Sequence, residues 1–323
     1  MLYRKIKIGS LQVPGNIFLA PMAGISDMAF RKLCAQNGAD LTYTEMVSAE
    51  GLFYNSKKTE ALLKKSQEEK YLAVQIFSGN EDMLIKAAEK LENTYHPCII
   101  DINSGCPVPK VTKTGAGAAL MREPQKIYRI INEIKKRIIT PITIKIRSGW
   151  NQEFLNYMEI ATAAIEAGVD ALCIHPRTKT QGYSGFADRT HIKNIKEKFP
   201  QLVVIASGDI NSPEEVESAF LETGCDAVMI ARGSMGKPWI FRQTKEYLNY
   251  GKYKEPDISE IKNTMLRHLE YAIEEKGERT AVKELRKHMA WYIKGIPHAA
   301  KLRKDFISCQ SQDDYKRLID SIS

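Results

Sequence analysis

Short apolar runs alternate with longer amphipathic stretches along the first three quarters of the chain. Eight runs rich in Ile, Val and Leu recur from residue 17 onward, and stretches with helical spacing separate them. Continuous apolar runs are typical of parallel strands buried on both faces, and eight strand and helix repeats predict a closed (β/α)8 barrel of the α/β class. The runs cover residues 17–20, 41–44, 72–76, 99–102, 142–146, 171–174, 203–206 and 227–230.

The strand pattern stops near residue 241, and the rest of the chain has helical spacing only. Five apolar residues recur there at intervals of three and four, so they share one helix face and predict a bundle core, while basic residues occupy another face. We expect a barrel domain over residues 1–241 and an all-helical domain over residues 242–323. The apolar residues are Val282, Leu285, Met289, Tyr292 and Ile296, and the basic ones are Arg279, Lys283, Arg286, Lys287 and Lys294, with Lys301, Arg303 and Lys304 just beyond.

Length and composition agree with a folded two-domain protein. The chain has 323 residues, enough for a barrel of roughly 250 residues and a smaller domain, and its hydrophobic fraction of 43% argues against long disorder. Its six cysteines form no CxxC pair or metal-type spacing, which favours free thiols and no metal centre. No membrane span or signal peptide is visible, so a cytoplasmic protein is expected. A net charge of +8 suits a polyanionic partner without establishing one.

Polar or small residues follow almost every predicted strand. The carboxyl ends of all strands in a parallel barrel open onto one mouth, so these residues should converge on a single site. The longest interval between strands follows residue 102, which predicts a functional loop above the mouth. The set comprises Pro21, Met22, Ala23, Gly24, Glu45, Gln75, Asn103, Cys106, Lys145, His175, Arg177, Ser207, Gly208, Asp209, Arg232 and Gly233.

Two residues of this set stand out because they lie within or at the end of apolar strands. Lys145 is flanked by isoleucines, where a charge costs on the order of several kcal/mol unless a partner compensates it. That partner is either a carboxylate of the barrel or, as we expect, a bound anion or anionic cofactor. His175 by itself is equally well a buried core residue, but the nearby Arg177 favours a role in the site.

Gly208 and Gly233 end the last two predicted strands. Each glycine alone is readily explained as a turn residue. Barrels commonly bind a phosphate at this pair of strand ends, where glycine lets backbone N–H groups approach it closely. A helix expected to begin after residues 236–238 would add its positive end. The pair therefore predicts a phosphate site.

Cys106 differs from the other cysteines because it lies between a glycine and a proline in a loop of exposed type, whereas Cys98, Cys173 and Cys225 border or lie in apolar runs. A thiol with a pKa of about 8.5 is mostly protonated at neutral pH, so it can act as a general acid or as a nucleophile. No HExxH, Walker loop, GxGxxG or Ser/His dyad accompanies it. We predict that Cys106 is catalytic.

Several short motifs together resemble the tRNA-dihydrouridine synthase family, in the order that the family has them. The most specific is Asn-Ser-Gly-Cys-Pro at 103–107, while Ala-Pro-Met and the phosphate glycines recur in other FMN barrels. The resemblance spans the whole barrel. The remaining motifs are Ala-Pro-Met-Ala-Gly at 20–24, Val-Gln-Ile at 74–76, Ile-Lys-Ile-Arg at 144–147, His-Pro-Arg-Thr at 175–178, Ser-Gly-Asp-Ile at 207–210, Ala-Arg-Gly at 231–233 and Pro-Trp at 238–239.

The resemblance implies an FMN-binding barrel with a C-terminal helical bundle, NADPH or else NADH as reductant, tRNA as substrate and no obligate protein partner. By position, Asn103 and Arg177 would face the substrate uracil or its backbone. The family commonly has asparagine where this chain has Ser207, which shortens the side chain available there. The residues implied to bind FMN are Pro21, Met22, Ala23, Gln75, Lys145, His175, Ser207, Gly208, Asp209, Ala231, Arg232 and Gly233.

The implied reaction gives Cys106 and Lys145 separate roles. Hydride transfer from flavin N5 to C6 of uracil leaves an enolate that must be protonated at C5, and a neutral Cys106 thiol is the expected acid. Lys145 would help to balance the anionic reduced flavin. The uridine must be flipped out of the folded tRNA at a cost of a few kcal/mol. Contacts to the RNA backbone would offset that cost, and the basic helix face with Lys283, Arg286 and Lys287 is their expected source.

Two other functions fit parts of the pattern. An FMN barrel acting on a small molecule, such as a dihydroorotate or dihydropyrimidine dehydrogenase, needs no basic bundle, yet residues 279–304 hold eight Lys or Arg and one acid, Glu284. That bias favours RNA, although a basic run can also be mere solvated surface. An RNA-binding barrel without catalysis is disfavoured by the presence of both Cys106 and Lys145.

Overall fold

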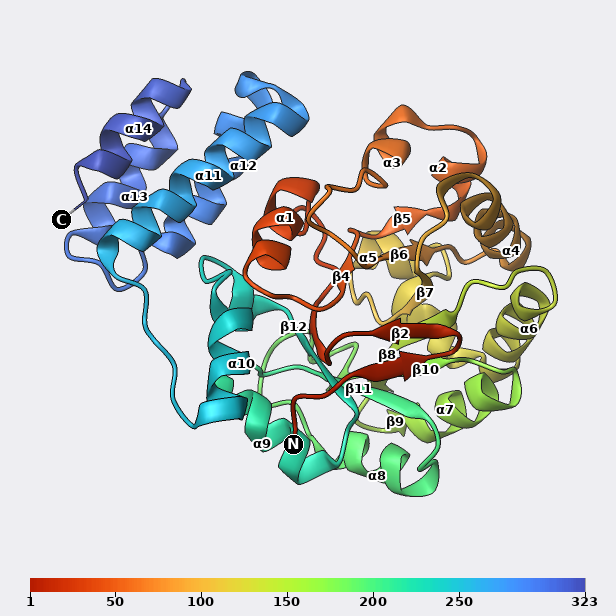
Figure 1. Cartoon of the computed structure of the whole chain (residues 1–323). Coiled ribbons are helices and arrows are strands. Elements are labelled where there is room, and N and C mark those ends of the chain that lie inside the picture. The colour runs from red at the N-terminus through yellow and green to blue at the C-terminus, as the bar shows by residue number, and fades with distance from the viewer. Residues whose placement is uncertain (323) are drawn as a thin grey trace.

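Eight parallel strands form a closed barrel in the computed structural model, which describes residues 1–322 (Figure 1). The strands are rich in Val, Ile and Leu and buried along nearly their whole length. The ring closes where Phe18 bridges Leu41. All eight predicted strands are confirmed, which confirms the (β/α)8 fold. In spatial order they are β3 (Ile17–Leu19), β12 (Ala227–Ile230), β11 (Val203–Ser207), β10 (Ala171–Thr178), β8 (Ile142–Asn151), β7 (Ile99–Ser104), β6 (Leu72–Phe77) and β4 (Thr42–Tyr43), while β5 (Val47–Ser48) pairs with β6 and β9 (Phe154–Leu155) with β8.

Helices connect the strands and cover the outside of the barrel. The clearest example is α6 (Pro124–Lys135), which begins with a proline in its first turn and buries Ile127, Ile130, Ile131 and Ile134 along one face. These isoleucines belong to the core layer between sheet and helices. The others are α1 (Met28–Gln36), α2 (Ala49–Phe53), α3 (Lys57–Ala61), α4 (Glu81–Lys90), η1 (Leu91–Tyr95), α5 (Pro109–Thr112), η2 (Gly117–Arg122), α7 (Tyr157–Glu166), α8 (Thr190–Lys198), α9 (Pro213–Thr223), η3 (Arg232–Ser234) and α10 (Ile240–Tyr250).

A short antiparallel hairpin, β1 (Ile6–Ile8) and β2 (Leu11–Val13), covers the end of the barrel opposite the mouth; it is the dark red pair at the front of Figure 1. Ile6, Ile8 and Val13 pack with apolar side chains from the barrel strands. The hairpin was not predicted because three-residue strands are too short for a periodic signal. It closes that end of the barrel, so the opposite end is the one left to form a site.

A bundle of four helices follows the barrel: α11 (Ile258–Lys276), α12 (Glu278–Tyr292), α13 (Ala299–Ser308) and α14 (Gln312–Asp320). The bundle core predicted from the sequence is confirmed, since Val282, Leu285, Met289 and Tyr292 are buried on one face of α12. Ile296 lies beyond the end of α12 and packs against the same cluster. Ala29 and Trp239 of the barrel domain also join this cluster, so the bundle packs against the barrel.

The predicted boundary between residues 241 and 242 falls inside α10. This helix packs against α9, and Ile240 and Phe241 belong to the core of the barrel. An extended segment, residues 251–257, then leads to α11 (Figure 1). The division into separate domains stays a prediction. Within residues 1–322 no helix is long and apolar enough to cross a membrane.

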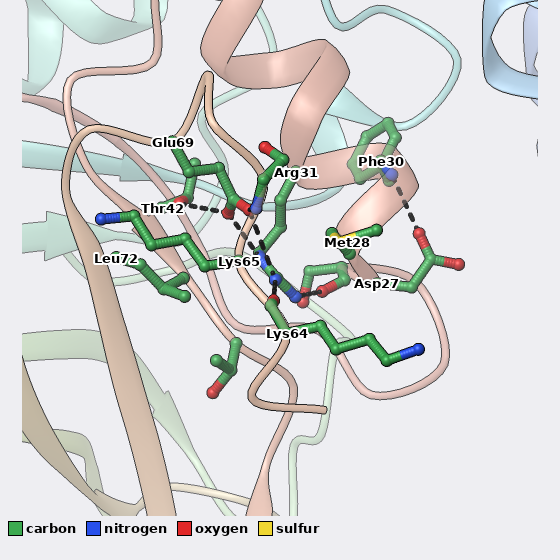
Figure 2. Close-up of polar contacts among 12 residues, drawn as sticks. Asp27, Met28, Phe30, Arg31, Thr42, Lys64, Lys65, Glu69 and Leu72 are labelled. Atoms are coloured by element: carbon green, nitrogen blue, oxygen red, sulfur yellow. Dashed lines mark hydrogen bonds and ion pairs between the residues drawn. The ribbon is translucent and has the colours of Figure 1, made fainter. Parts of the chain in front are cut away.

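A buried ion pair fastens α1 to the segment before β6. Figure 2 shows the Arg31 side chain pointing from α1 toward Glu69, whose carboxylate lies 2.7 Å from Arg31 Nε. Arg31 also donates to the carbonyl oxygens of Ser26 and Lys64, and Thr42 donates to Glu69. Because both charged groups are inside the protein, each depends on these hydrogen bonds to compensate its lost hydration. The pair holds α1 and the loop before it, residues 21–27, in place beside the mouth.

Candidate active site

The carboxyl ends of the strands surround a cavity of about 410 Å³. The structure brings most of the residues predicted for the site to its wall, because the strand ends meet there. The members of that set that do not line it are Gly24, Glu45, Arg177 and Gly233. Those that do are Pro21, Met22, Ala23, Gln75, Asn103, Cys106, Lys145, His175, Ser207, Gly208, Asp209, Ala231 and Arg232.

Lys145 reaches the cavity from β8 without a carboxylate partner. Within residues 1–322, no acidic group lies within 4.0 Å of its Nζ and no side chain or backbone group forms a hydrogen bond with that atom. The charge of Lys145 acts on one buried acid, Asp101, but the Asp101 carboxylate accepts its hydrogen bonds from Gln75 and Thr143. Pairing with a barrel carboxylate is therefore not the explanation for this lysine. Its ammonium is available to an anion in the cavity.

His175 is held as a neutral ring at the end of β10. Burial first, and then the charges of Lys145, Arg147, Arg177 and Arg232, lower its pKa to about 2. Arg177 Nη1 lies 3.1 Å from His175 Nε2. Since arginine only donates, Nε2 is the acceptor and Nδ1 carries the hydrogen. His175 is thus a hydrogen-bond donor through Nδ1 at any physiological pH.

Arg177 does not face the cavity, contrary to the role implied for it with the substrate. Its side chain is 2% exposed, and its guanidinium donates to the carboxylate of Asp209 at 2.7 Å and to the carbonyl oxygens of Ser184 and Gly185. Its remaining contact is with His175. Each nitrogen of the Arg177 guanidinium has a partner within the chain, so this residue holds the wall of the site in position.

The turn after β11 approaches its neighbours very closely. Gly208 has a φ of +98°, and a Cβ there would lie 2.7 Å from Cδ2 of His175. Asp209 follows with a φ of +48°, and its carboxylate accepts from Arg177, Arg232 and the backbone of Ala187. Only glycine at position 208 leaves the His175 ring in place. The side chain of Asp209 serves the wall, which leaves its backbone for a ligand.

Gly233 lies behind the wall. A Cβ at this position would be 2.4 Å from the carbonyl oxygen of Ile210. The glycine therefore allows the turn after β12 to pack against the turn after β11. Its direct contact with a phosphate is not supported by this position, whereas Ser207, Gly208, Ala231 and Arg232 remain at the cavity.

Cys106 lies on the wall of the cavity and not in an exposed loop as expected. It is 9% exposed and packs with Val111 and Ala116. Its backbone N–H donates to Asn103 Oδ1 at 3.0 Å, and its carbonyl accepts from Ala118. Burial raises the pKa of the thiol, and the Val108 N–H and the charges of Arg147 and Lys145 oppose that rise only in part. The thiol is thus protonated at neutral pH.

Arg147 is a residue of the site that sequence reasoning did not select. It lines the cavity from β8, two positions after Lys145, and donates to the carbonyl oxygens of Gly105, Thr178 and Gly182. The alternation of a strand would have found it, because residues 145 and 147 point to the same side. Tyr183 also lines the cavity, from the loop after β10. No spacing rule indicates a residue in such a loop.

The three bundle cations expected to bind RNA are not equivalent. Lys283 is exposed. Arg286 instead donates to the carbonyl oxygen of Cys309 at 2.9 Å, and Lys287 donates to the carbonyl oxygen of Gly24 in the loop beside the cavity. Helical periodicity placed all three away from the bundle core, but it could not show that two are used within the chain.

The arrangement defines a class of protein: a (β/α)8 barrel whose mouth combines an unpaired lysine, a neutral histidine and a protonated thiol. A family model described as dihydrouridine synthase matches residues 18–322. The chain belongs to the dihydrouridine synthase family. This finding confirms the resemblance noted in the sequence.

Relatives with the same description align along nearly their whole lengths. A probable tRNA-dihydrouridine synthase of Treponema pallidum is 39% identical over 302 residues, covering 91% of this chain and 89% of the relative. The tRNA-dihydrouridine synthase B of Pasteurella multocida is also 39% identical over 302 residues, covering 93% and 90%. The histamine dehydrogenase from Rhizobium sp. 4-9 has a similar fold, with a TM-score of 0.59 and 12% identity over 84% of this chain and 51% of that one.

Proposed function

We propose that this chain is a tRNA-dihydrouridine synthase that binds FMN in the barrel cavity and uses NADPH, or else NADH, to reduce a uridine of tRNA. The observation that carries the proposal is the meeting of an unpaired ammonium, Lys145, and a protonated thiol, Cys106, on the wall of one cavity. Family membership and the names of the relatives support the substrate. Such a substrate is consistent with the cytoplasmic location expected from the sequence.

The residues present fit FMN. Lys145 offers an ammonium with no carboxylate partner in the described residues, and Gly208 lies at the cavity wall so close to His175 that a side chain would displace that ring. Ser207, Gly208, Ala231 and Arg232 would hold the phosphate, while Pro21, Met22 and Ala23 would lie against the ring, with Gln75 and Lys145 at its polar edge. Bound and reduced, FMN would supply the hydride for C6 of uracil. The shorter Ser207 in place of asparagine leaves the phosphate contacts to backbone and Arg232.

Cys106 would deliver the proton that the reduction of the C5=C6 bond requires. Burial keeps its sulfur protonated, so the Sγ–H is ready to be transferred to C5 as the enolate of the uracil collapses. The charges of Lys145 and Arg147 stabilise the thiolate that remains. A later proton from solvent restores the thiol, so the residue acts as an acid and needs no covalent bond to the base.

Neutral His175 and cationic Lys145 would have different tasks. His175 donates one hydrogen bond through Nδ1 without adding charge, because Arg177 occupies its Nε2. Lys145 contributes the positive charge that an anionic cofactor needs in a site closed by apolar strands. Asn103 has only its remaining amide hydrogen for the substrate, since its oxygen holds the loop of Cys106.

A uridine within folded tRNA must leave its stack to reach the cavity, at a cost of a few kcal/mol. Exposed cations of the bundle would offset that cost by binding the RNA backbone. The described bundle presents Arg279, Lys283, Lys294, Lys301, Arg303 and Lys304 as exposed residues. They replace Arg286 and Lys287 as the proposed RNA contacts.

The experiment is an assay of the purified protein with FMN, NADPH and tRNA that lacks dihydrouridine. Mass spectrometry of the digested tRNA should show a gain of two hydrogens at a uridine. Reduction of free uracil or of a small-molecule relative in place of tRNA would favour the alternative of a small-molecule FMN enzyme. A protein that takes up no flavin would refute the proposal.

A further inference from the structure

A chain of hydrogen bonds connects the interior of the barrel to the loop of Cys106. Asp101 on β7 is 1% exposed, and its Oδ2 accepts from Gln75 Nε2 at 2.6 Å. The oxygen of the same Gln75 amide accepts from Asn103 Nδ2 at 2.7 Å. Asn103 Oδ1 then accepts from the backbone N–H of Gly105 at 3.2 Å and of Cys106 at 3.0 Å. This series of hydrogen bonds ends at Cys106, the residue that carries the thiol.

The direction of every link follows from its first member. A carboxylate only accepts, so Gln75 must turn its NH2 toward Asp101 and its oxygen toward Asn103. That oxygen in turn requires the NH2 of Asn103, which leaves Asn103 Oδ1 to face the loop. The reverse orientation of either amide would place two donors or two acceptors against each other. An acceptor at position 101 thus determines that an acceptor meets the Cys106 N–H.

We propose that Asp101 is a positioning residue for the proton donor: through Gln75 and Asn103 it fixes the loop that holds the Cys106 thiol on the cavity wall. The proposal rests on the proposed function, because it concerns the acid of that reaction. Asp101 itself does not line the cavity. Its contribution is therefore to geometry and not to binding of the substrate.

Asp101 is well placed to be sensitive to its surroundings. Burial raises its pKa to about 6, while its hydrogen bonds with Gln75 and Thr143 and the charge of Lys145 oppose the rise. Two neutral groups, the Tyr43 phenol and the Cys173 thiol, face it from β4 and β10. When Asp101 binds a proton it becomes a donor as well as an acceptor, and the orientation of Gln75 is no longer enforced.

Alkylation of Cys106 in the flavin-loaded protein measures this positioning directly. Peptide mass spectrometry separates Cys106 from the other five cysteines. Asp101→Leu should release the loop and raise the rate of Cys106 alkylation about tenfold at pH 7.5. The kcat for tRNA should fall about 100-fold with KM changed by less than about threefold, because small displacements of a reacting group have effects of that size.

Asp101→Asn imitates the protonated carboxyl, because its amide is both a donor and an acceptor and can turn either group toward Gln75. Its alkylation rate at pH 7.5 should exceed the wild-type rate by about threefold, less than the increase for Asp101→Leu, which can make neither hydrogen bond. The wild-type rate should rise above its own thiolate-dependent line below pH 6, where Asp101 binds a proton, while Asp101→Asn should follow its own line at every pH. Identical pH profiles for the two proteins would overturn the proposal, even if Asp101→Leu did not fold.

Asp40→Asn serves as a matched control, because Asp40 is also a buried barrel aspartate but precedes β4, at the end away from the mouth. It should leave Cys106 alkylation at the wild-type rate. An increase equal to that of Asp101→Leu would mean general loosening and would refute positioning. The alkylation rate reports how firmly the loop holds the Cys106 thiol, whether or not Cys106 is the acid of the reaction. Failure of the proposed function would appear separately, as unchanged turnover in Cys106→Ala.

Discussion

The cavity of the barrel and the basic face of the bundle both contain the cations expected from the sequence, but the two regions use them differently. In the cavity, Lys145 has no carboxylate partner within residues 1–322, and Arg232 lines the wall. In the bundle, Arg286 and Lys287 bind carbonyl oxygens of the chain, and Lys283 stays exposed. A cation inside the barrel without a partner requires a ligand, whereas an engaged cation on a helix is part of the fold.

The largest expected effect is at the cavity. Cys106→Ala should lower the rate of dihydrouridine formation by about 100-fold or more, since a general acid contributes factors of that size. Flavin content and tRNA affinity should stay within about twofold of wild type, because the residue is small and lies at the wall. Rapid-quench kinetics measures the rate of dihydrouridine formation. Absorbance of the bound flavin measures the flavin content, and filter binding measures the affinity for tRNA. An unchanged rate would show that Cys106 is not the proton donor. The comparison of the cavity with the bundle would then depend on Lys145 alone.

Removal of the unpaired charge should have the next largest effect. Lys145→Met should weaken FMN binding by about 10- to 100-fold, the amount expected for a hydrogen bond to a charged group. Lys179→Met is a matched control, since Lys179 lies beside Trp150 and does not line the cavity. Fluorescence titration of the apoprotein with FMN gives both affinities. Equal affinities of Lys145→Met and wild type for FMN would contradict the claim that this cation binds an anionic ligand.

A buried histidine pair of the bundle, His268 and His288, packs against Phe30 of α1, so the attachment of the bundle to the barrel should be sensitive to acid. Burial lowers the pKa of His268 to about 4 and that of His288 well below its usual 6.5. In the unfolded chain these histidines bind protons near pH 6.5, whereas in the folded protein they stay neutral to a lower pH. Their contribution to the free energy of unfolding is therefore fully present above pH 6.5 and is lost as the pH drops toward 4. We expect the Tm to decrease by several degrees between pH 7 and pH 5.

His288→Phe tests this point, because both ring nitrogens of His288 are buried without a partner among the described residues. Replacement by an apolar ring of similar shape should be nearly neutral at pH 7.5 and should reduce the acid-dependent loss of Tm. Scanning calorimetry at several pH values gives the comparison. If variant and wild type lose the same number of degrees, the histidines are not the cause.

The smallest effect concerns the bundle and separates its two kinds of cation. Lys283→Ala should weaken tRNA binding only a few-fold but reduce the slope of log K against log salt by about 1, as for the loss of one phosphate contact. Lys287→Ala should instead loosen the loop at Gly24 and weaken FMN binding, with the salt slope unchanged. Filter binding at four salt concentrations decides between them. Equal salt slopes for both variants would contradict the distinction between an exposed cation that binds RNA and a cation that is engaged within the protein.

The sequence predicted the members of the cavity well because topology alone brings strand ends together. Gln75, Lys145 and His175 each end or interrupt an apolar run, and a parallel barrel leaves them one place to meet. The fate of individual side chains could not be predicted in this way. The resemblance implied a substrate contact for Arg177, yet its guanidinium contacts Asp209, His175 and two carbonyl groups of a loop whose path has no periodic signal.

The same limit applies to the bundle and to short elements. Periodicity indicated which face of α12 is buried, but Lys287 finds its acceptor on Gly24, more than 260 residues away in the chain. The β1 and β2 hairpin is too short for its alternation to be seen. Contacts of this kind depend on how elements pack, which composition and spacing do not encode.

The most direct test of the account is a single turnover with the flavin as its own indicator. The purified protein, with its flavin reduced in the absence of oxygen, is mixed with tRNA that lacks dihydrouridine. The account predicts that the absorbance of oxidised flavin returns, that one dihydrouridine forms for each flavin oxidised, and that Cys106→Ala slows both. A flavin that stays reduced in the presence of this tRNA, or a protein that binds no flavin, would contradict it.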